Sequence, residues 1–231
     1  MKKYIPNTIT CLNLLSGCIA CVMAFGGSFF WAFVWIMLAA VFDFLDGLAA
    51  RLLKAYSPMG KELDSLADMV SFGVAPGFIV FHVLNLLADS LPLSQYIPYP
   101  YIAFLIPVFS ALRLAKFNID DRQTDSFVGL PTPANAMFWS SAVVGTYYSY
   151  SAEYALIYSV VTIVLVIALS LLMVSELPMF SLKVKNLSWK DNQIRYVLIL
   201  ISILAIAFLG WTGIAATIIF YILFSVVASI R

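Results

Sequence analysis

Residues 42–68 read FDFLDGLAARLLKAYSPMGKELDSLAD and follow an unbroken apolar run, yet they contain four aspartates. Asp43 and Asp46 are three residues apart, and Asp64 and Asp68 are four apart. Residues at these spacings lie on one face of an α-helix. The stretch therefore predicts two helices, each presenting a pair of carboxylates.

The link between the two pairs is short and turns at Ser57 and Pro58. We expect the two helices to be antiparallel neighbours whose carboxylates meet near the membrane surface. Carboxylates this close repel one another, and a divalent cation with oxygen ligands would balance them. Four carboxylates suffice for two ions, whereas zinc is not expected because no His or Cys lies nearby in sequence.

The composition places this stretch in a membrane protein. Of the 231 residues, 63% are hydrophobic and 11% are charged, against about 25% charged in soluble domains. A net charge of +1 gives no basic surface for nucleic acid. Apolar runs long enough to cross a bilayer recur along the chain. We predict an all-α polytopic bundle, with residues 1–231 forming a single domain. The eight expected spans cover residues 5–25, 29–53, 60–86, 98–117, 132–149, 153–175, 194–209 and 212–230.

The basic residues predict the orientation of these spans. With eight spans, all 13 Lys and Arg fall on one side of the membrane. By the positive-inside rule this side is the cytoplasm, and both termini lie there. Residues 5–175 would form the core helices, and residues 194–230 a tight C-terminal hairpin around Gly210. Gly73 and Gly77 form a GxxxG pattern, which indicates a helix contact.

The residues next to the carboxylates suggest a ligand. Gly47 and Ala50 lack bulk, and Arg51 supplies a forked donor suited to phosphate. These features leave two possibilities open: a metal-dependent enzyme acting on phosphorylated substrates, or a cation or proton transporter. Transporters more often carry such charges near mid-membrane on broken helices. A cluster at the cytoplasmic helix ends favours chemistry on a substrate that is half in lipid and half in water.

The stretch resembles the signature of the CDP-alcohol phosphatidyltransferase family, D-x2-D-G-x2-A-R-x8-G-x3-D-x3-D. Within this family the chain is most similar to phosphatidylserine synthases, in the segments IPNTITCLNLLSG, DMVSFGVAPG, ALRLAKFN and GLPTPANA. The eight fixed positions of the signature are matched by Asp43, Asp46, Gly47, Ala50, Arg51, Gly60, Asp64 and Asp68.

The resemblance implies a homodimer in a prokaryotic cell membrane, with a polar cavity open to the cytoplasm and to the surrounding lipids. CDP-diacylglycerol and L-serine would react to give phosphatidylserine and CMP. Two divalent cations, Mg²⁺ or Mn²⁺, would be held by Asp43, Asp46, Asp64 and Asp68, with Asp68 also acting as the general base. Glycerol 3-phosphate or inositol phosphate remain open as alternative acceptors.

The expected substrate contacts form two groups. Helix capping is an alternative role for Asn7 and Thr10. Positive-inside anchoring is an alternative role for Arg113 and Lys116. The residues expected at CDP-diacylglycerol are Asn7, Thr10, Gly47, Ala50, Arg51, Ser57 and Gly60. Those expected at serine are Arg113, Lys116, Asn118, Thr132 and Asn135.

Overall fold

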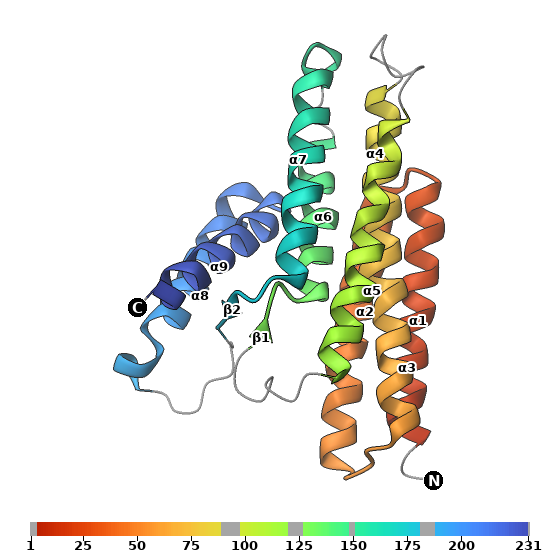
Figure 1. Ribbon diagram of the computed structural model, residues 1–231, viewed down its shortest axis with the longest axis vertical. Helices are drawn as coiled ribbons and strands as arrows, with labels where there is room; N and C mark the ends of the chain where they lie inside the picture. The colour runs from red at the N-terminus through yellow and green to blue at the C-terminus, as the bar shows by residue number, and fades with distance from the viewer. Residues whose placement is uncertain (1–3, 89–97, 120–126, 148–150, 181–187, 231) are drawn as a thin grey trace.

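The structure is a computed structural model, which describes residues 4–88, 98–119, 127–147, 151–180 and 188–230. These residues form an elongated helical bundle, with a C-terminal helical hairpin that leans away from it (Figure 1). The all-α prediction is confirmed for the described residues, whose strands are limited to one pair of two-residue segments.

The first half of the chain forms three long helical rods. They are α1 (Tyr4–Phe25), α2 (Phe29–Leu52) and the continuous run α3 (Pro58–Asp68), η1 (Met69–Val74) and α4 (Ala75–Ala88). Helix α1 packs along α2 and also against α3 and α4. It therefore lies beside both segments that carry the aspartates.

The second half adds the remaining helices and the strand pair. Helices α6 and α7 pack against α4, while α8 and α9 pack on each other as an antiparallel hairpin (Figure 1). The elements are η2 (Tyr99–Phe104), α5 (Leu105–Ile119), β1 (Phe127–Val128), α6 (Thr132–Thr146), η4 (Ala152–Tyr154), α7 (Ala155–Val174), β2 (Pro178–Met179), α8 (Trp189–Leu209) and α9 (Thr212–Ile230).

Seven helical segments of the described chain are long and apolar enough to cross a membrane. They correspond to seven of the eight predicted spans. The eighth, predicted at 132–149, coincides with α6, which has 15 residues where a span needs about 20. The end of that predicted span, residues 148–149, lies outside the described residues. The count of eight and the cytoplasmic position of both termini stay predictions, and six of the basic residues behind them are not described: Lys2, Lys3, Arg122, Lys183, Lys185 and Arg231.

A π-helical segment interrupts the rod that the sequence predicts as one helix at 60–86. Segment η1 follows Asp68 directly, and such π turns occur frequently at functional sites. The predicted helix contact at Gly73 and Gly77 is confirmed, with Gly73 inside this segment and Gly77 just after it. A Cβ on Gly73 would lie 3.0 Å from Ser110 Cβ, and one on Gly77 would lie 2.9 Å from Pro107 Cδ. Both glycines therefore let the rod approach α5 closely.

The strand pair joins the segment before the start of α6 to the segment after the end of α7. Strand β1 pairs antiparallel with β2, with Phe127 opposite Met179. Gly129 continues the pairing by donating its N–H to the carbonyl of Leu177 at 2.9 Å. Its φ of +75° favours glycine, and a Cβ there would lie 2.4 Å from the carbonyl oxygen of Met173. This pair leads directly into the start of α6.

The tight C-terminal hairpin is also confirmed. Helix α8 ends at Leu209, Gly210 adopts a φ of +58°, and α9 begins at Thr212. Helix α9 then packs against α6 and β2. The hairpin is thus joined to the elements that surround the strand pair.

Candidate active site

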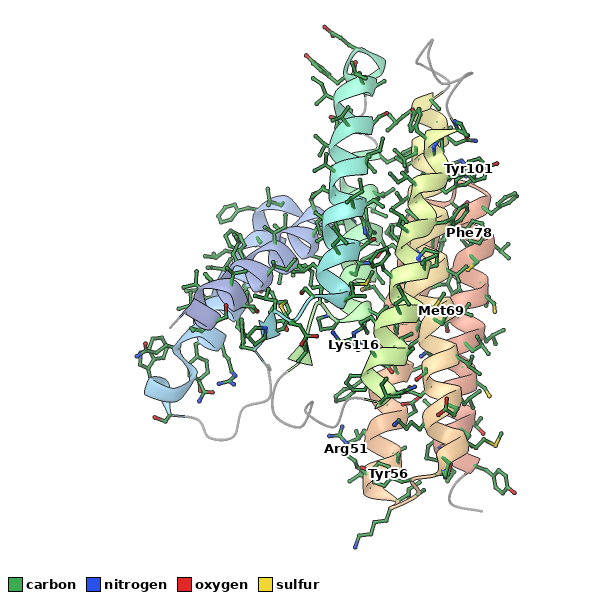
Figure 2. All side chains as sticks on the ribbon, viewed as in Figure 1. Arg51, Tyr56, Met69, Phe78, Tyr101 and Lys116 are labelled. Atoms are coloured by element: carbon green, nitrogen blue, oxygen red, sulfur yellow. The ribbon has the colours of Figure 1, made fainter. Side chains whose placement is uncertain are left out.

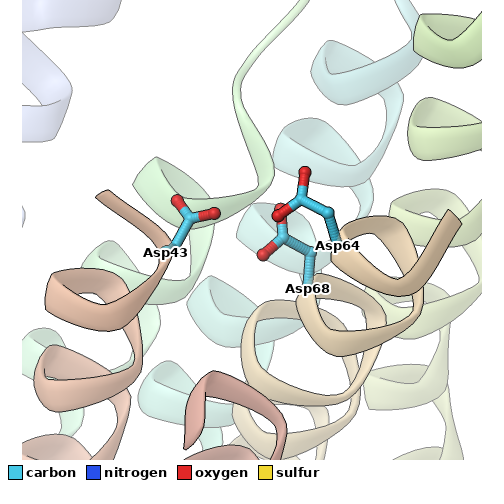
Figure 3. Close-up of side chains that lie close together, drawn as sticks. All are labelled: Asp43, Asp64 and Asp68. Carbon is cyan, nitrogen blue, oxygen red and sulfur yellow. The ribbon is translucent and has the colours of Figure 1, made fainter. Parts of the chain in front are cut away.

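Three carboxylates meet where α2 faces α3. Asp43 projects from α2 toward Asp64 and Asp68, which lie one turn apart on α3 (Figure 3). One oxygen from each lies within 4.8 Å of the others. Asp68 is only 8% exposed, and Oδ1 of Asp64 is buried with no hydrogen-bond partner among the described residues. The prediction that the two helices bring their carboxylates together is confirmed for these three.

The fourth predicted ligand, Asp46, is held differently. It lies outside the group of three, and its Oδ2 accepts a hydrogen bond of 2.7 Å from Thr10 Oγ1 on α1. Both side chains are buried. Asp46 lies one turn beyond Asp43 on α2 and, together with Asp64, lines an adjacent cavity. It therefore connects the carboxylate group to that cavity.

Helix α1 contributes a second polar contact that the sequence did not single out. Asn13 is fully buried and donates from Nδ2 to Oδ1 of Asp68 at 3.1 Å. Its backbone carbonyl accepts a hydrogen bond from Ser71 Oγ on η1. Asn13 lies three residues after Thr10, so the signal available in the sequence was a polar pair on one face of an otherwise apolar helix.

The adjacent cavity has a volume of about 230 Å³ and lies between the start of α1, the end of α2 and the start of α3. It gathers most of the residues expected to contact CDP-diacylglycerol. Lys61 and Tyr56, which the sequence did not single out, also line it. The expected residues that line the cavity are Asn7, Thr10, Gly47, Ala50, Ser57 and Gly60.

Arg51 is the expected residue that the structure leaves outside this cavity. Its side chain is exposed at the end of α2 (Figure 2), and its Nε donates to the carbonyl of Gly47 at 3.0 Å. Ser57 has a local role as well as a place in the cavity wall. It caps the start of α3 by accepting a 3.0 Å hydrogen bond from the Gly60 N–H.

Arg113, on α5, lies near two of the carboxylates. It is 7% exposed, and its Nη1 donates to Thr132 Oγ1 at 3.0 Å. Its guanidinium interacts electrostatically with Asp68 and Asp43. Asn135, one turn after Thr132 on α6, is fully buried, and neither its amide nitrogen nor its amide oxygen has a partner among the described residues. The structure therefore brings a buried cation and an unsatisfied amide to the start of α6.

The two other residues expected at serine make contacts elsewhere. Lys116 forms an ion pair with Glu176 and donates to the carbonyl of Val174 at 3.3 Å. Asn118 donates from Nδ2 to Ser65 Oγ at 2.8 Å. Both side chains join α5 to neighbouring segments, so their part in serine binding stays a prediction.

The residues of this site fit a hard divalent cation. The donors are carboxylate oxygens, which suit Mg²⁺ and Mn²⁺ rather than softer ions. Within the described residues, no Lys or Arg forms an ion pair with Asp43, Asp64 or Asp68. The unpartnered Oδ1 of Asp64 is a further oxygen available to a cation.

Fold and site together define a polytopic membrane protein with a carboxylate centre beside a cavity. The family model of the CDP-alcohol phosphatidyltransferases matches residues 3–175, which include every residue of this site. The chain belongs to this family. Helices α8 and α9 lie beyond the matched region.

Similar proteins are found in bacteria and archaea. The CDP-diacylglycerol–serine O-phosphatidyltransferase of Bacillus subtilis is 37% identical over 135 residues, which cover 58% of this chain and 72% of that protein. The protein of the same name from Helicobacter pylori strain J99 is 36% identical over 57% of this chain and 54% of its own length. The archaetidylserine synthase of Methanothermobacter thermautotrophicus is 32% identical over 75% of this chain and 68% of that protein.

Proposed function

We propose that this protein transfers a phosphatidyl group from CDP-diacylglycerol to the hydroxyl of L-serine and releases CMP. The observation that carries the proposal is the junction of Asp43, Asp64 and Asp68 with a cavity lined by the signature residues Gly47, Ala50 and Gly60. The names of the similar bacterial proteins support serine as the acceptor. The archaeal relative is named for the same head group.

In the proposed reaction the serine oxygen attacks the phosphorus on the lipid side of the diphosphate. A new P–O bond forms, the P–O bond to CMP breaks, and CMP leaves with the bonding electron pair. Asp68 accepts the proton of the serine hydroxyl. Because Asn13 donates to Oδ1 of Asp68, it holds this carboxylate in one orientation toward the other two.

Asp43, Asp46, Asp64 and Asp68 would hold two divalent cations, Mg²⁺ or Mn²⁺. When bound, the ions neutralise the diphosphate and the charge that develops on the leaving CMP. Without them the carboxylates would repel the diphosphate. Thr10 keeps Asp46 turned toward the cavity through its hydrogen bond.

The substrates would approach from two sides of the carboxylates. The cavity beside Asp46 receives the cytidine diphosphate, with Asn7, Ser57 and the small residues around it, and Arg51 at its outer edge. The serine carboxylate would bind the guanidinium of Arg113, a donor suited to carboxylates. Thr132 and the unsatisfied amide of Asn135 would complete the acceptor side, with Lys116 and Asn118 further out.

The proposed reaction would take place at the cytoplasmic face of the membrane. The protein would act as a homodimer in the membrane of a prokaryotic cell, with the carboxylates facing the cytoplasm. Arg51 and Lys116 lie lower in Figure 2 than Phe78 and Tyr101. Lys61 lines the cavity that Asp46 and Asp64 also line. A basic cytoplasmic end agrees with the positive-inside rule.

The test is an acceptor assay with the purified full-length chain in lipid nanodiscs. CDP-diacylglycerol and Mg²⁺ or Mn²⁺ are supplied with serine, glycerol 3-phosphate or inositol phosphate, and CMP release is followed. We expect release only with serine, loss of release in EDTA, and recovery on adding either ion. Release with a phosphorylated acceptor alone would reassign the acceptor, and no release with any acceptor would favour a transport function.

A further inference from the structure

The cavity beside Asp46 contains little positive charge. Asp46 and Asp64 line it, and Lys61 is the only basic residue among its described lining residues. Arg51 lies outside the cavity, and its Nε donates to the carbonyl of Gly47 in its own helix. Lys61 is therefore the cation that the chain itself places in the cavity wall.

A diphosphate in this cavity needs such a cation. In the proposed reaction the charges of two divalent ions are balanced by the four carboxylates that hold them. The negative charge that the diphosphate brings is then left without a counter-charge, which is costly wherever water is partly excluded. A lysine ammonium is a compact charge that suits phosphate oxygens.

The ammonium of Lys61 keeps donors available for a ligand. Lys61 lies in the first turns of α3, one turn before Asp64. Its Nζ donates to the backbone carbonyl of Asn118, on α5, at 2.9 Å. An ammonium has three N–H donors, and Lys61 forms no ion pair with a described carboxylate. Donors therefore remain for phosphate oxygens.

The hydrogen bond to Asn118 also restricts where the ammonium lies. The side chain of Asn118 donates from Nδ2 to Oγ of Ser65 at 2.8 Å, and Ser65 lies one turn after Lys61 on α3. Two hydrogen bonds thus join α5 to α3, and one of them holds Nζ of Lys61. Ordering a long side chain before the ligand arrives lowers the entropy cost of binding.

We propose that Lys61 binds the diphosphate of the nucleotide lipid and supplies the protein's own positive charge in this cavity. This inference rests on the proposed function, and it deepens it by adding a substrate-binding residue that lies outside the eight fixed positions of the family signature. It predicts that Lys61 recognises the phosphates of the ligand and contributes nothing to recognition of the nucleoside.

The test compares two ligands that differ only in the diphosphate. Binding of radiolabelled CDP to the full-length protein in nanodiscs with Mg²⁺ gives the Kd for CDP, and displacement of the label by cytidine gives the Kd for the nucleoside. Lys61→Gln removes the charge at similar length, and Lys61→Arg restores it.

Two controls separate charge from packing. Ser65→Ala removes the side-chain link between α3 and α5 but leaves the Lys61 hydrogen bond in place. Lys54→Gln removes an exposed charge that does not line the cavity. The thermal unfolding temperature is recorded for each protein.

We expect Lys61→Gln to raise the Kd for CDP about tenfold, as for the loss of a hydrogen bond to a charged group, with the Kd for cytidine within twofold. Lys61→Arg should stay within threefold of the unmodified protein for CDP, and both controls should bind CDP normally.

Three results would overturn the inference: a Kd for CDP within twofold in Lys61→Gln, an equal loss of affinity for CDP and cytidine, or the same loss for CDP in Ser65→Ala. The last would show that Lys61 acts only through the junction of α3 with α5. If the unmodified protein binds CDP but releases no CMP with serine, the proposed transfer fails, which is a separate outcome.

Discussion

Asn13 of α1 donates a 3.1 Å hydrogen bond to Asp68 of α3, 55 positions further along the chain. One turn earlier, Thr10 donates in the same way to Asp46 of α2 at 2.7 Å. Helix α1 carries no carboxylate of its own, yet it orients one carboxylate on each of the two helices that do. The site is therefore built from three helices, although its acidic residues come from two.

Removing the Asn13 amide tests whether its hydrogen bond orients Asp68. A hydrogen bond to a charged group contributes about 1.5–3 kcal/mol, so we expect Asn13→Ala to lower kcat for serine-dependent CMP release about 10- to 100-fold. Ser16→Ala is the matched control, because Ser16 is buried on the same helix but donates only to the Leu12 carbonyl of its own helix. Equal activities of the two variants would show that Asn13 does not orient Asp68.

The hydrogen bond from Thr10 to Asp46 can be tested with two substitutions that change the side chain little. Thr10→Val keeps the volume but removes the donor to Asp46, whereas Thr10→Ser keeps the donor. We expect Thr10→Val to raise the KM for CDP-diacylglycerol about tenfold, in keeping with a charge-assisted hydrogen bond, and Thr10→Ser to stay within threefold of the unmodified protein. A similar KM for both variants would contradict the role given to this hydrogen bond.

Substitutions at two glycines should affect different properties: one the stability of the protein, the other the binding of its ligand. A Cβ on Gly17 would lie 2.3 Å from Ser71 Oγ and 2.7 Å from its Cα, whereas a Cβ on Gly47 meets nothing within 4 Å. We expect Gly17→Ala to destabilise the protein by about 1–3 kcal/mol, seen as a lower thermal unfolding temperature in detergent.

Gly47→Ala should unfold at the normal temperature and instead weaken CDP-diacylglycerol binding, because Gly47 lines the cavity. The account would be wrong about this position if Gly47→Ala lost stability while keeping its affinity for the nucleotide lipid.

A substitution at Arg113 tests whether this residue binds the carboxylate of the acceptor. Arg113→Lys keeps the charge but loses the planar fork that suits a carboxylate. We predict a rise of about tenfold in the KM for serine, the equivalent of about 1.4 kcal/mol, with little change in the KM for CDP-diacylglycerol. Lys54→Gln, an exposed charge in the turn after α2, should change neither KM. A normal serine KM in Arg113→Lys would remove the acceptor carboxylate from this part of the site.

Much of the fold follows from patterns that the sequence displays. The apolar runs predicted the long helices, Gly210 predicted the C-terminal turn, and Gly73 and Gly77 predicted a close helix contact. These succeed because each has a local physical cause, such as helix length, a positive φ or a missing Cβ. The meeting of Asp43 with Asp64 and Asp68 was also predictable, since the turn at Ser57 and Pro58 reverses the chain between them.

The rest depends on contacts between segments that are distant in sequence. The π turn after Asp68 has no periodic signature, and the pairing of β1 with β2 joins two-residue segments too short to be recognised. The role of Asn13 depends on how α1 lies against α3, which its own sequence does not encode.

The central claim, that the carboxylate group performs the transfer, is tested most directly by CMP release from Asp68→Asn. This change keeps the shape of the side chain and removes the proposed base. We predict that serine-dependent release falls about 10²- to 10⁴-fold, with an unchanged unfolding temperature. Glu62→Gln, an exposed carboxylate on the same helix, should release CMP at the normal rate. Turnover by Asp68→Asn within tenfold of the unmodified protein would contradict the account.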